Sequence, residues 1–293
     1  MVKLSPNSIK PYKTLQKHLT EFCQFNEVSD YELTSIDKKF YSNFSKFLQD
    51  KGFKISTIAK YIKAFGAILN RAIDEKHYHT PDKKVKFQSP TEKDVDTIYF
   101  NETELQQLKD TDLSKIPYLE RVRDMFLLLC WTGCRFSDLS KIGKNNIKNN
   151  RIEISHQQKT GERVIIPIFP TTKEILEKYN YEPFKISNQK FNEFIKIACE
   201  KAGFDEEITY SRIIKGERKE FVYKKYELVT SHTGRRSFCT NMYEKGLDTT
   251  MIMSVSGHKS LDVFLHYIKT TREKHADRML QAWTNLEKTS INK

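Results

Sequence analysis

The segment that most constrains the fold is an apolar helix in the first half of the chain. Tyr118–Trp131 has helical periodicity, and its centre, Met125–Leu129, leaves the helix apolar on most sides. Such a helix is stable only where other elements enclose it. The longest uninterrupted apolar run, Met125–Trp131, has seven residues, whereas a membrane span needs roughly 20. The segment therefore predicts the centre of a globular domain, with a helix end at Gly133.

The net charge indicates the kind of partner. The chain of 293 residues carries 50 lysines and arginines against 38 acidic residues, a net charge of +12. This excess favours a polyanion, although charge alone does not separate DNA from RNA or an anionic membrane surface. The hydrophobic content of 38% is enough for packed cores, and the length suits two domains.

Two features indicate the compartment. Residues 1–13 lack the apolar core of a signal peptide. The five cysteines are scattered and form no CxxC pair. This pattern suits free thiols in a reducing cytosol, so we expect a cytoplasmic protein with neither a disulfide scaffold nor a zinc site.

Residues 1–88 are predicted to form a small helical domain. Apolar residues recur at helical spacing in three stretches: Tyr12, Leu15, Leu19 and Phe22; Phe40, Phe44 and Phe47; and Ile58, Ile62, Phe65 and Leu69. The second stretch is expected to end at Gly52, and Ser56 is a candidate N-cap for the third.

Basic residues concentrate around the third of these helices. Between Lys51 and Pro90, nine lysines and arginines stand against three acidic residues, a net charge of +6. We expect Lys54, Lys60 and Lys63 on the solvent side of the helix. They form either an ordinary solvated face or contacts to DNA phosphates.

A linker is predicted at residues 89–97, in a stretch rich in proline and charge, and a second domain at residues 98–293. Asn101 and Glu104 have the spacing of a capping box. Residues 151–157 with 163–169, and 206–214 with 218–226, are expected to form two hairpins. Further helices are expected at 171–179, 187–202 and 230–246, two short ones around Gly257, and a last one at 272–286. The fold class is therefore mainly α with small β hairpins.

Six residues in four short motifs form a candidate active site. The members are Arg135 in TGCRFSDL, Lys159 in QQKTGERVIIPI, His232 and Arg235 in SHTGRRSF, and His258 and Tyr267 in GHKSLDVFLHY. A spacing of three puts the histidine and arginine of HxxR on one helical face. A guanidinium grips two phosphate oxygens at once, a histidine donates to an oxygen or moves a proton, and a lysine protonates a leaving oxygen. Together the six predict a phosphate site beside a tyrosine nucleophile.

Four of the six members also have an ordinary structural interpretation, and many helices carry an HxxR pair by chance. Arg135 has an acidic residue, Asp138, three positions on, and a turn lysine is usually only solvated. His258 can serve as a helix-capping residue. Tyr267 is one of 14 tyrosines and can pack in the core. The order of the motifs and the short gaps between the last of them, more than any single residue, favour the phosphate site.

The ordered set resembles the tyrosine recombinase family, also called phage-type integrases, and within it the integrases of bacterial mobile elements. TGCRFSDL looks like the first arginine box and QQKTGERVIIPI like the lysine hairpin. SHTGRRSFCTNMYEKG looks like the HxxR box, and GHKSLDVFLHY like the histidine and tyrosine boxes. The resemblance covers nearly the whole chain. It implies a helical, SAM-like core-binding domain followed by a mixed α/β catalytic domain.

The resemblance implies site-specific recombination through cutting and rejoining of DNA. Tyr267 would attack a scissile phosphate and form a 3′-phosphotyrosyl bond, while the arginines and histidines stabilise the charged phosphate and Lys159 protonates the departing oxygen. No metal or other cofactor is implied.

The implied partners are double-stranded DNA and further copies of the chain, in a homotetramer on two DNA sites. Arg236 is either structural or a contact to the DNA backbone. An accessory DNA-bending protein is a further candidate partner. We expect no arm-binding domain of the kind that many mobile-element integrases carry, so the chain is either a trimmed form or a simpler Xer-like or invertase-type enzyme, which acts alone or with accessory proteins. The apolar stripe of the last helix is expected to dock on its own core or on a neighbouring protomer. Its members are Met279, Leu280, Trp283 and Leu286.

Three other functions share some of these features. A type IB topoisomerase-like enzyme would use the same chemistry for DNA relaxation. A non-cleaving, sequence-specific DNA-binding protein would need only the basic surface. A metal-dependent nuclease would want clustered carboxylates, which the HxxR and GH motifs lack.

Overall fold

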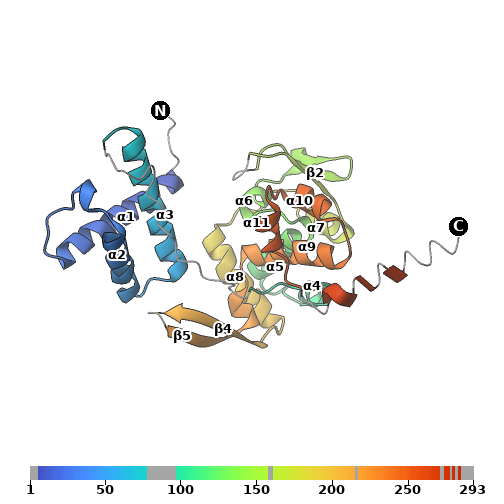
Figure 1. Ribbon diagram of the computed structural model, residues 1–293. Coiled ribbons are helices and arrows are strands. Elements are labelled where there is room, and N and C mark those ends of the chain that lie inside the picture. The colour runs from blue at the N-terminus through green and yellow to red at the C-terminus, as the bar shows by residue number, and fades with distance from the viewer. Residues whose placement is uncertain are drawn as a thin grey trace. The chain divides into compact units, whose positions relative to one another are not determined.

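The computed structural model describes residues 6–77, 97–157, 161–214, 217–270, 274–277, 279–280 and 283–284. The chain divides into two compact units, residues 1–96 with 209–221, and residues 97–208 with 222–293. Helices dominate both units, and the described strands form only two small sheets (Figure 1). The predicted fold class is confirmed.

The N-terminal helices enclose an aromatic core. They are α1 (Pro6–Phe25), α2 (Lys38–Asp50) and α3 (Ile55–Asp74), with a short 3₁₀ turn at Leu33–Ser35. The ring of Phe22 on α1 lies 5.3 Å from that of Phe44 on α2, and both side chains are buried. Rings at this separation add stability beyond the apolar area that they bury. The predicted apolar faces of all three helices therefore point to one core.

The prediction that Ser56 caps the third helix was wrong by two residues. Lys54 is the N-cap, in extended conformation, and its carbonyl accepts hydrogen bonds from the backbone N–H groups of Thr57 and Ile58. The helix starts at once after this carbonyl, so Ser56 falls inside its first turn.

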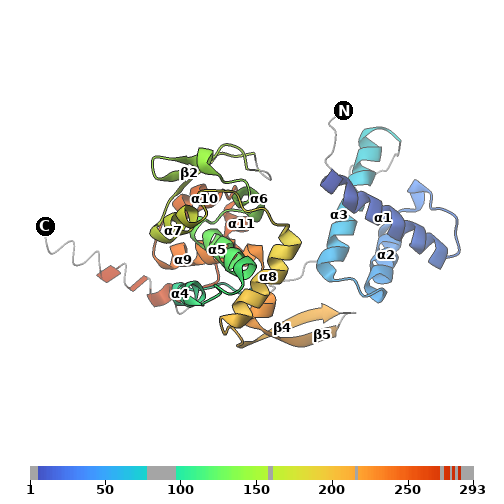
Figure 2. The same ribbon diagram turned by 180° about the vertical axis from the view of Figure 1, so that it is seen from behind.

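In the second unit, the predicted central helix is α5 (Pro117–Thr132). It packs against α4 (Glu102–Asp110), α7 (Pro170–Lys178), α8 (Asn188–Lys201) and α9 (Ser231–Glu244), and Figure 2 shows it among them. The side chains of Leu127, Leu128 and Leu129 are all buried, which agrees with an apolar helix enclosed on every side. The helix ends at Gly133, whose φ of 64° is left-handed. The start of α4 carries the predicted capping box of Asn101 and Glu104.

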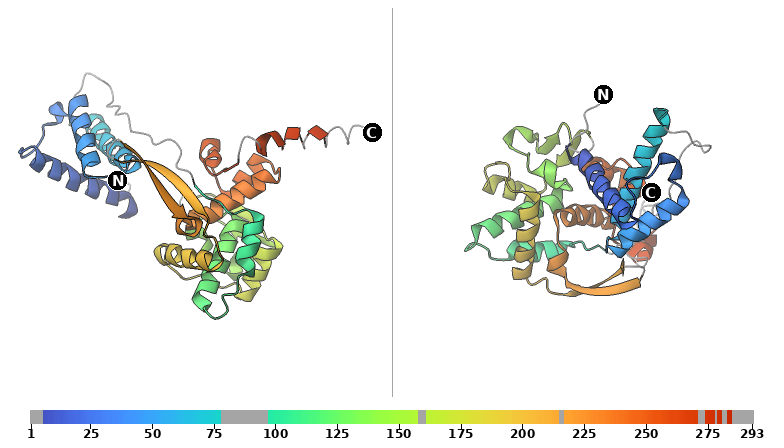
Figure 3. Two further views of the ribbon diagram at one scale, coloured as in Figure 1. Left: turned by 90° about the horizontal axis from the view of Figure 1, so that it is seen from below. Right: turned by 90° about the vertical axis from the view of Figure 1, so that its left-hand side faces the viewer.

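The two sheets are antiparallel. The first has the order β1 (Ile147–Lys148), β2 (Arg151–Ile154) and β3 (Val164–Pro167), with Ile152 opposite Ile166. Alternate residues of β2 and β3 are buried, as half-buried strands require. The second pairs β4 (Glu207–Ile214) with β5 (Glu217–Lys224), which form the long ribbon seen in Figure 3.

Short helices complete the chain. They are α6 (Phe136–Leu139), α10 (Thr249–Ser256) and α11 (Leu261–Leu265), with 3₁₀ turns at Lys144–Asn146 and Lys225–Leu228. Of the predicted last helix, residues 274–277, 279–280 and 283–284 are helical, and the others, Leu286 among them, lie outside the described residues. Met279, Leu280 and Trp283 are each more than 60% exposed. No helix in the described residues is both long and apolar enough to cross a membrane.

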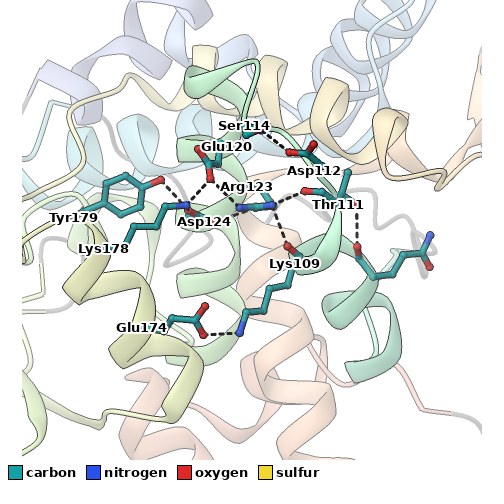
Figure 4. A network of polar contacts seen from close by, with 11 residues as sticks. Lys109, Thr111, Asp112, Ser114, Glu120, Arg123, Asp124, Glu174, Lys178 and Tyr179 are labelled. Carbon is teal, nitrogen blue, oxygen red and sulfur yellow. Dashed lines mark hydrogen bonds and ion pairs between the residues drawn. The ribbon is translucent and has the colours of Figure 1, made fainter.

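In the second unit, a charge-balanced cluster joins three residues of α5, Glu120, Arg123 and Asp124, to Lys178 at the end of α7 (Figure 4). Arg123 is 7% exposed, and its Nε donates to Asp124 at 2.8 Å while Nη1 donates to the carbonyls of Lys109 and Thr111. Lys178 bridges Asp124 and Glu120 at 2.7 Å each. Two cations thus face two carboxylates, and every charge has a partner.

All five cysteines are free thiols. The four in the second unit are buried, and burial raises the pKa of the Cys134 thiol to about 12 and that of Cys239 to about 11.

Candidate active site

Five of the six predicted residues line one pocket of about 330 Å³ in the second unit. The five are Arg135, His232, Arg235, His258 and Tyr267. They come from the α5–α6 junction, α9, the end of α10 and the end of α11. Lys159 lies outside the described residues, so its place in the site stays a prediction.

Arg235 is the most deeply buried member, with 1% of its surface exposed. Its Nη1 donates to the carbonyl of Gly133 at 2.7 Å and to that of Ser256, and Nη2 contacts Nε2 of His258 at 2.9 Å. Its Nε is also buried and has no acceptor among the described residues. Burial, and next the charge of Arg135, lower the pKa of this guanidinium. Two like charges therefore lie close together, and the ion pairs of the described residues include none between Arg235 and a carboxylate.

Arg135 lies two residues after Gly133, the glycine that ends α5, and serves as N-cap of α6. Its Nη1 donates to Oε1 of Gln157 at 2.7 Å, and its Nη2 donates to the carbonyl of Gly257 at 3.2 Å. Gly257 has a φ of 72°, and a Cβ there would lie 2.4 Å from the same Gln157 oxygen. Position 257 therefore requires glycine both for its backbone conformation and for the close approach of Gln157.

His258 contacts both Arg235 and Tyr267. Its Nδ1 is 2.8 Å from Oγ of Ser256, and its Nε2 faces Arg235. Burial, followed by the charges of Arg235 and Arg135, lowers the pKa of His258 to about 3. The imidazole is therefore neutral at pH 7 and adds no charge of its own to the pocket.

Tyr267 follows α11 and is half-buried. Its ring meets that of His258 edge-on at 4.7 Å, and the guanidinium carbon of Arg235 lies 5.6 Å from its ring centre. Its backbone carbonyl accepts a hydrogen bond from Oγ1 of Thr240 on α9, at 2.9 Å. The helix that carries HxxR thus fixes the position of the tyrosine.

His232 occupies the first turn of α9, three residues before Arg235, and its side chain is exposed at the pocket. Reciprocal hydrogen bonding between Thr230 and Thr233 starts this helix. An exposed histidine in the same pocket as half-buried Arg135 and buried Arg235 is placed to meet a ligand that arrives from solvent.

The other predicted DNA contacts differ from one another in setting. Lys54, Lys60 and Lys63 are exposed, as expected of either a solvated face or a DNA contact. Arg236 is half-buried and donates to the carbonyl of Ile98 at 2.8 Å, which ties α9 to the segment before α4. This contact agrees with its structural interpretation.

Sequence reasoning missed two residues that hold the site together, Gln157 and Ser256. Gln157 is 2% exposed and precedes Lys159 by two positions, and Ser256 is fully buried directly before the GH motif. Gln157 opens the motif QQKTGERVIIPI and Ser256 precedes GH, but no local pattern indicates that the fold buries them against the site.

Comparison with known proteins gives the same family. The profile of the Phage integrase family matches residues 99–274, and that of the Phage integrase SAM-like domain matches residues 2–87. Tyrosine recombinase XerD of Listeria monocytogenes serovar 1/2a is 25% identical over 280 residues, which covers 94% of this chain and 91% of the relative. XerD of Oceanobacillus iheyensis is 26% identical over 288 residues, with the same coverage.

Solved structures share the fold. The Tn1549 transposon integrase in complex with circular intermediate DNA has a TM-score of 0.66 at 15% identity, covering 95% of this chain and 94% of that one. A lambda integrase dimer bound to a COC′ core site has a TM-score of 0.67 at 18% identity, covering 92% and 90%. The match to the Phage integrase family profile, residues 99–274, alone spans more than half of the sequence. This chain therefore belongs to the phage integrase family of tyrosine site-specific recombinases.

Proposed function

We propose that this recombinase cuts and rejoins double-stranded DNA through a 3′-phosphotyrosyl bond on Tyr267. One observation carries the proposal. Two arginines lie together in a pocket beside a tyrosine, and Arg235 is buried without a carboxylate partner among the described residues. An uncompensated buried cation is costly, so a site that keeps one is built for an anion that arrives with the substrate.

The proposed bond changes are those that membership of the family implies. The phenolic oxygen of Tyr267 attacks the phosphorus and the P–O5′ bond breaks, so that the phosphate moves to the tyrosine and a 5′-hydroxyl is released. The phenolic proton leaves to a base, and O5′ gains a proton, for which Lys159 is the proposed donor. Reversal with a different 5′-hydroxyl rejoins the strand.

The arginines stabilise the charge that builds up on phosphate oxygens in this transfer. Arg235 and Arg135 both line the pocket, so each guanidinium is proposed to donate to a phosphate oxygen there. Donors held in place before the reaction need no reorganisation as charge develops. Exposed His232 supplies a further donor.

Relatives support the choice of substrate and assembly. The Tn1549 integrase and lambda integrase have been solved on DNA, the latter also as a tetramer bound to a Holliday junction. We infer that this chain likewise binds duplex DNA and exchanges strands as a homotetramer on two sites. The exposed apolar residues Met279, Leu280 and Trp283 are the proposed contact to a neighbouring protomer.

Covalent trapping tests the chemistry. Nicked suicide duplexes drawn from DNA that flanks the gene are incubated with the full chain in EDTA, and any adduct is mapped by mass spectrometry. We expect an adduct on Tyr267 that Tyr267→Phe abolishes, while the matched variant Tyr181→Phe, at a tyrosine outside the pocket, retains it. Salt-sensitive DNA binding without an adduct would instead support a non-cleaving binding protein. An adduct on another tyrosine would assign the nucleophile elsewhere.

Truncation tests the assembly. A chain that ends at Thr271 should bind a single DNA site as the full chain does but fail to join two sites. Unchanged pairing of two labelled duplexes on native gels would contradict the proposed role of the C-terminal segment.

A further inference from the structure

One chain of hydrogen bonds joins Arg235, His258, Ser256 and the carbonyl of Ile252, and only one arrangement of protons satisfies it. A guanidinium can only donate, so Nη2 of Arg235 donates to Nε2 of His258, 2.9 Å away. Because Nε2 is then an acceptor and the ring is neutral, the ring proton resides on Nδ1.

Ser256 receives that proton. Its hydroxyl donates to the carbonyl of Ile252 at 2.6 Å, four residues back on α10, so its oxygen remains available as an acceptor. The Nδ1–H of His258 donates to this oxygen at 2.8 Å. The chain therefore runs from Arg235 through His258 and Ser256 to a backbone carbonyl, with one proton on each link.

The alternative tautomer would break this chain at its first link. A proton on Nε2 would point an N–H at the N–H of Arg235, with both groups buried. The guanidinium or the ring would have to move, although the carbonyls of Gly133 and Ser256 also hold the guanidinium. The serine hydroxyl is the group that favours the correct tautomer from the other side of the ring.

We propose that Ser256 is a positioning residue, which fixes the tautomer and ring orientation of His258 and through it the guanidinium of Arg235. The same residue contributes its carbonyl to Arg235, so the end of α10 holds this arginine by two routes. The kinetic consequence rests on the proposed function, whereas the tautomer does not.

Nitrogen NMR tests the tautomer without any DNA. In the full chain labelled with ¹⁵N-histidine, the His258 signals are identified by their loss in His258→Gln. We expect a neutral ring at pH 7 with a protonated Nδ1, whose proton exchanges slowly with water. In Ser256→Ala the exchange of this proton should accelerate by about tenfold or more, because its buried acceptor is gone. A protonated Nε2 or a charged ring in the unaltered protein would overturn the proposal.

Strand cleavage tests the consequence. Single-turnover cleavage by Ser256→Ala should slow by about tenfold at unchanged DNA affinity, and Ser256→Thr, which keeps the hydroxyl, should recover most of the rate. Ser254→Ala is the matched control, because Ser254 is exposed on the same helix and donates only to the carbonyl of Met251. Equal rates for Ser256→Ala and Ser254→Ala would overturn the positioning role. Absence of cleavage by every protein, with the expected tautomer present, would count against the proposed function alone.

Discussion

Two buried arginines of the same unit, Arg123 and Arg235, are held in opposite ways. Arg123 is paired with Asp124, and Lys178 and Glu120 complete a cluster with balanced charge (Figure 4). Arg235 is more deeply buried but is held by two carbonyls and a neutral histidine. The difference agrees with the proposal that Arg123 stabilises the fold, whereas Arg235 is kept available for an anion.

The largest effect should come from Arg235→Lys. Lysine keeps the charge but loses the planar fork that both grips a phosphate and reaches the acceptors around it. We expect single-turnover cleavage to slow by about 10³-fold or more. A rate within tenfold of the unaltered protein, in the presence of normal DNA binding, would contradict the central role of this residue.

Replacement of each arginine by methionine should lower the free energy of unfolding more at Arg123 than at Arg235, although Arg235 is the more deeply buried. Arg123→Met leaves Asp124 and Glu120 with one cation fewer, and it should lower the free energy of unfolding by about 3–5 kcal/mol. Arg235→Met leaves no carboxylate unpaired in the described structure and should cost less. Urea unfolding of the two variants measures this difference, and a larger loss in Arg235→Met would show that the comparison is wrong.

The lowered pKa of His258 should make the free energy of unfolding depend on pH. The pKa of His258 is about 3 in the folded protein, below the usual value of 6.5, so the unfolded chain binds the extra proton between these values. The contribution of His258 is thus present above about pH 6.5 and is lost as the pH falls. Between pH 7 and pH 5 it should remove about 2 kcal/mol, a loss that His258→Gln should lack. Parallel pH profiles of the two proteins would contradict the shift.

The exposed lysines of α3 add a third kind of cation to the comparison of Arg123 with Arg235. Their substitution should have the smallest effect on stability and DNA binding. Lys60 and Lys63 lie on the surface of α3, where removal of either should hardly change stability. If they contact DNA phosphates, each substitution by alanine should weaken binding on every sequence. It should also reduce the slope of log affinity against log salt by about one. Titrations at several salt concentrations measure this slope, and Lys17→Ala on α1 is an exposed control.

The sequence was most informative where chemistry restricts the residue type. The proposed chemistry requires arginine, histidine and tyrosine at Arg135, His258 and Tyr267, so their motifs could be identified from the sequence. The structure brings all three residues to one pocket. The apolar pattern of α5 also predicted its place in the fold, because an enclosed helix has no polar face.

The contacts that hold the site residues in place could not be predicted from the sequence, because they join residues far apart in the chain. Gln157 reaches Arg135 across 22 positions, and Gly257 reaches it across 122. The missed start of α3 has a local cause, since the carbonyl of Lys54 starts the helix before the residue with the better capping side chain. Neither outcome follows from the preference of any single residue type.

The buried cysteines have a practical consequence for the study of motion. A thiol reacts with alkylating reagents as its thiolate, so the raised pKa and the burial of Cys134 and Cys239 together protect them while the unit stays closed. Their modification requires local opening, and the labelling rate at a given reagent concentration measures how often that opening occurs. Since Cys134 lines the pocket, mass spectrometry of labelled protein would report local opening at the candidate active site, without an engineered labelling position.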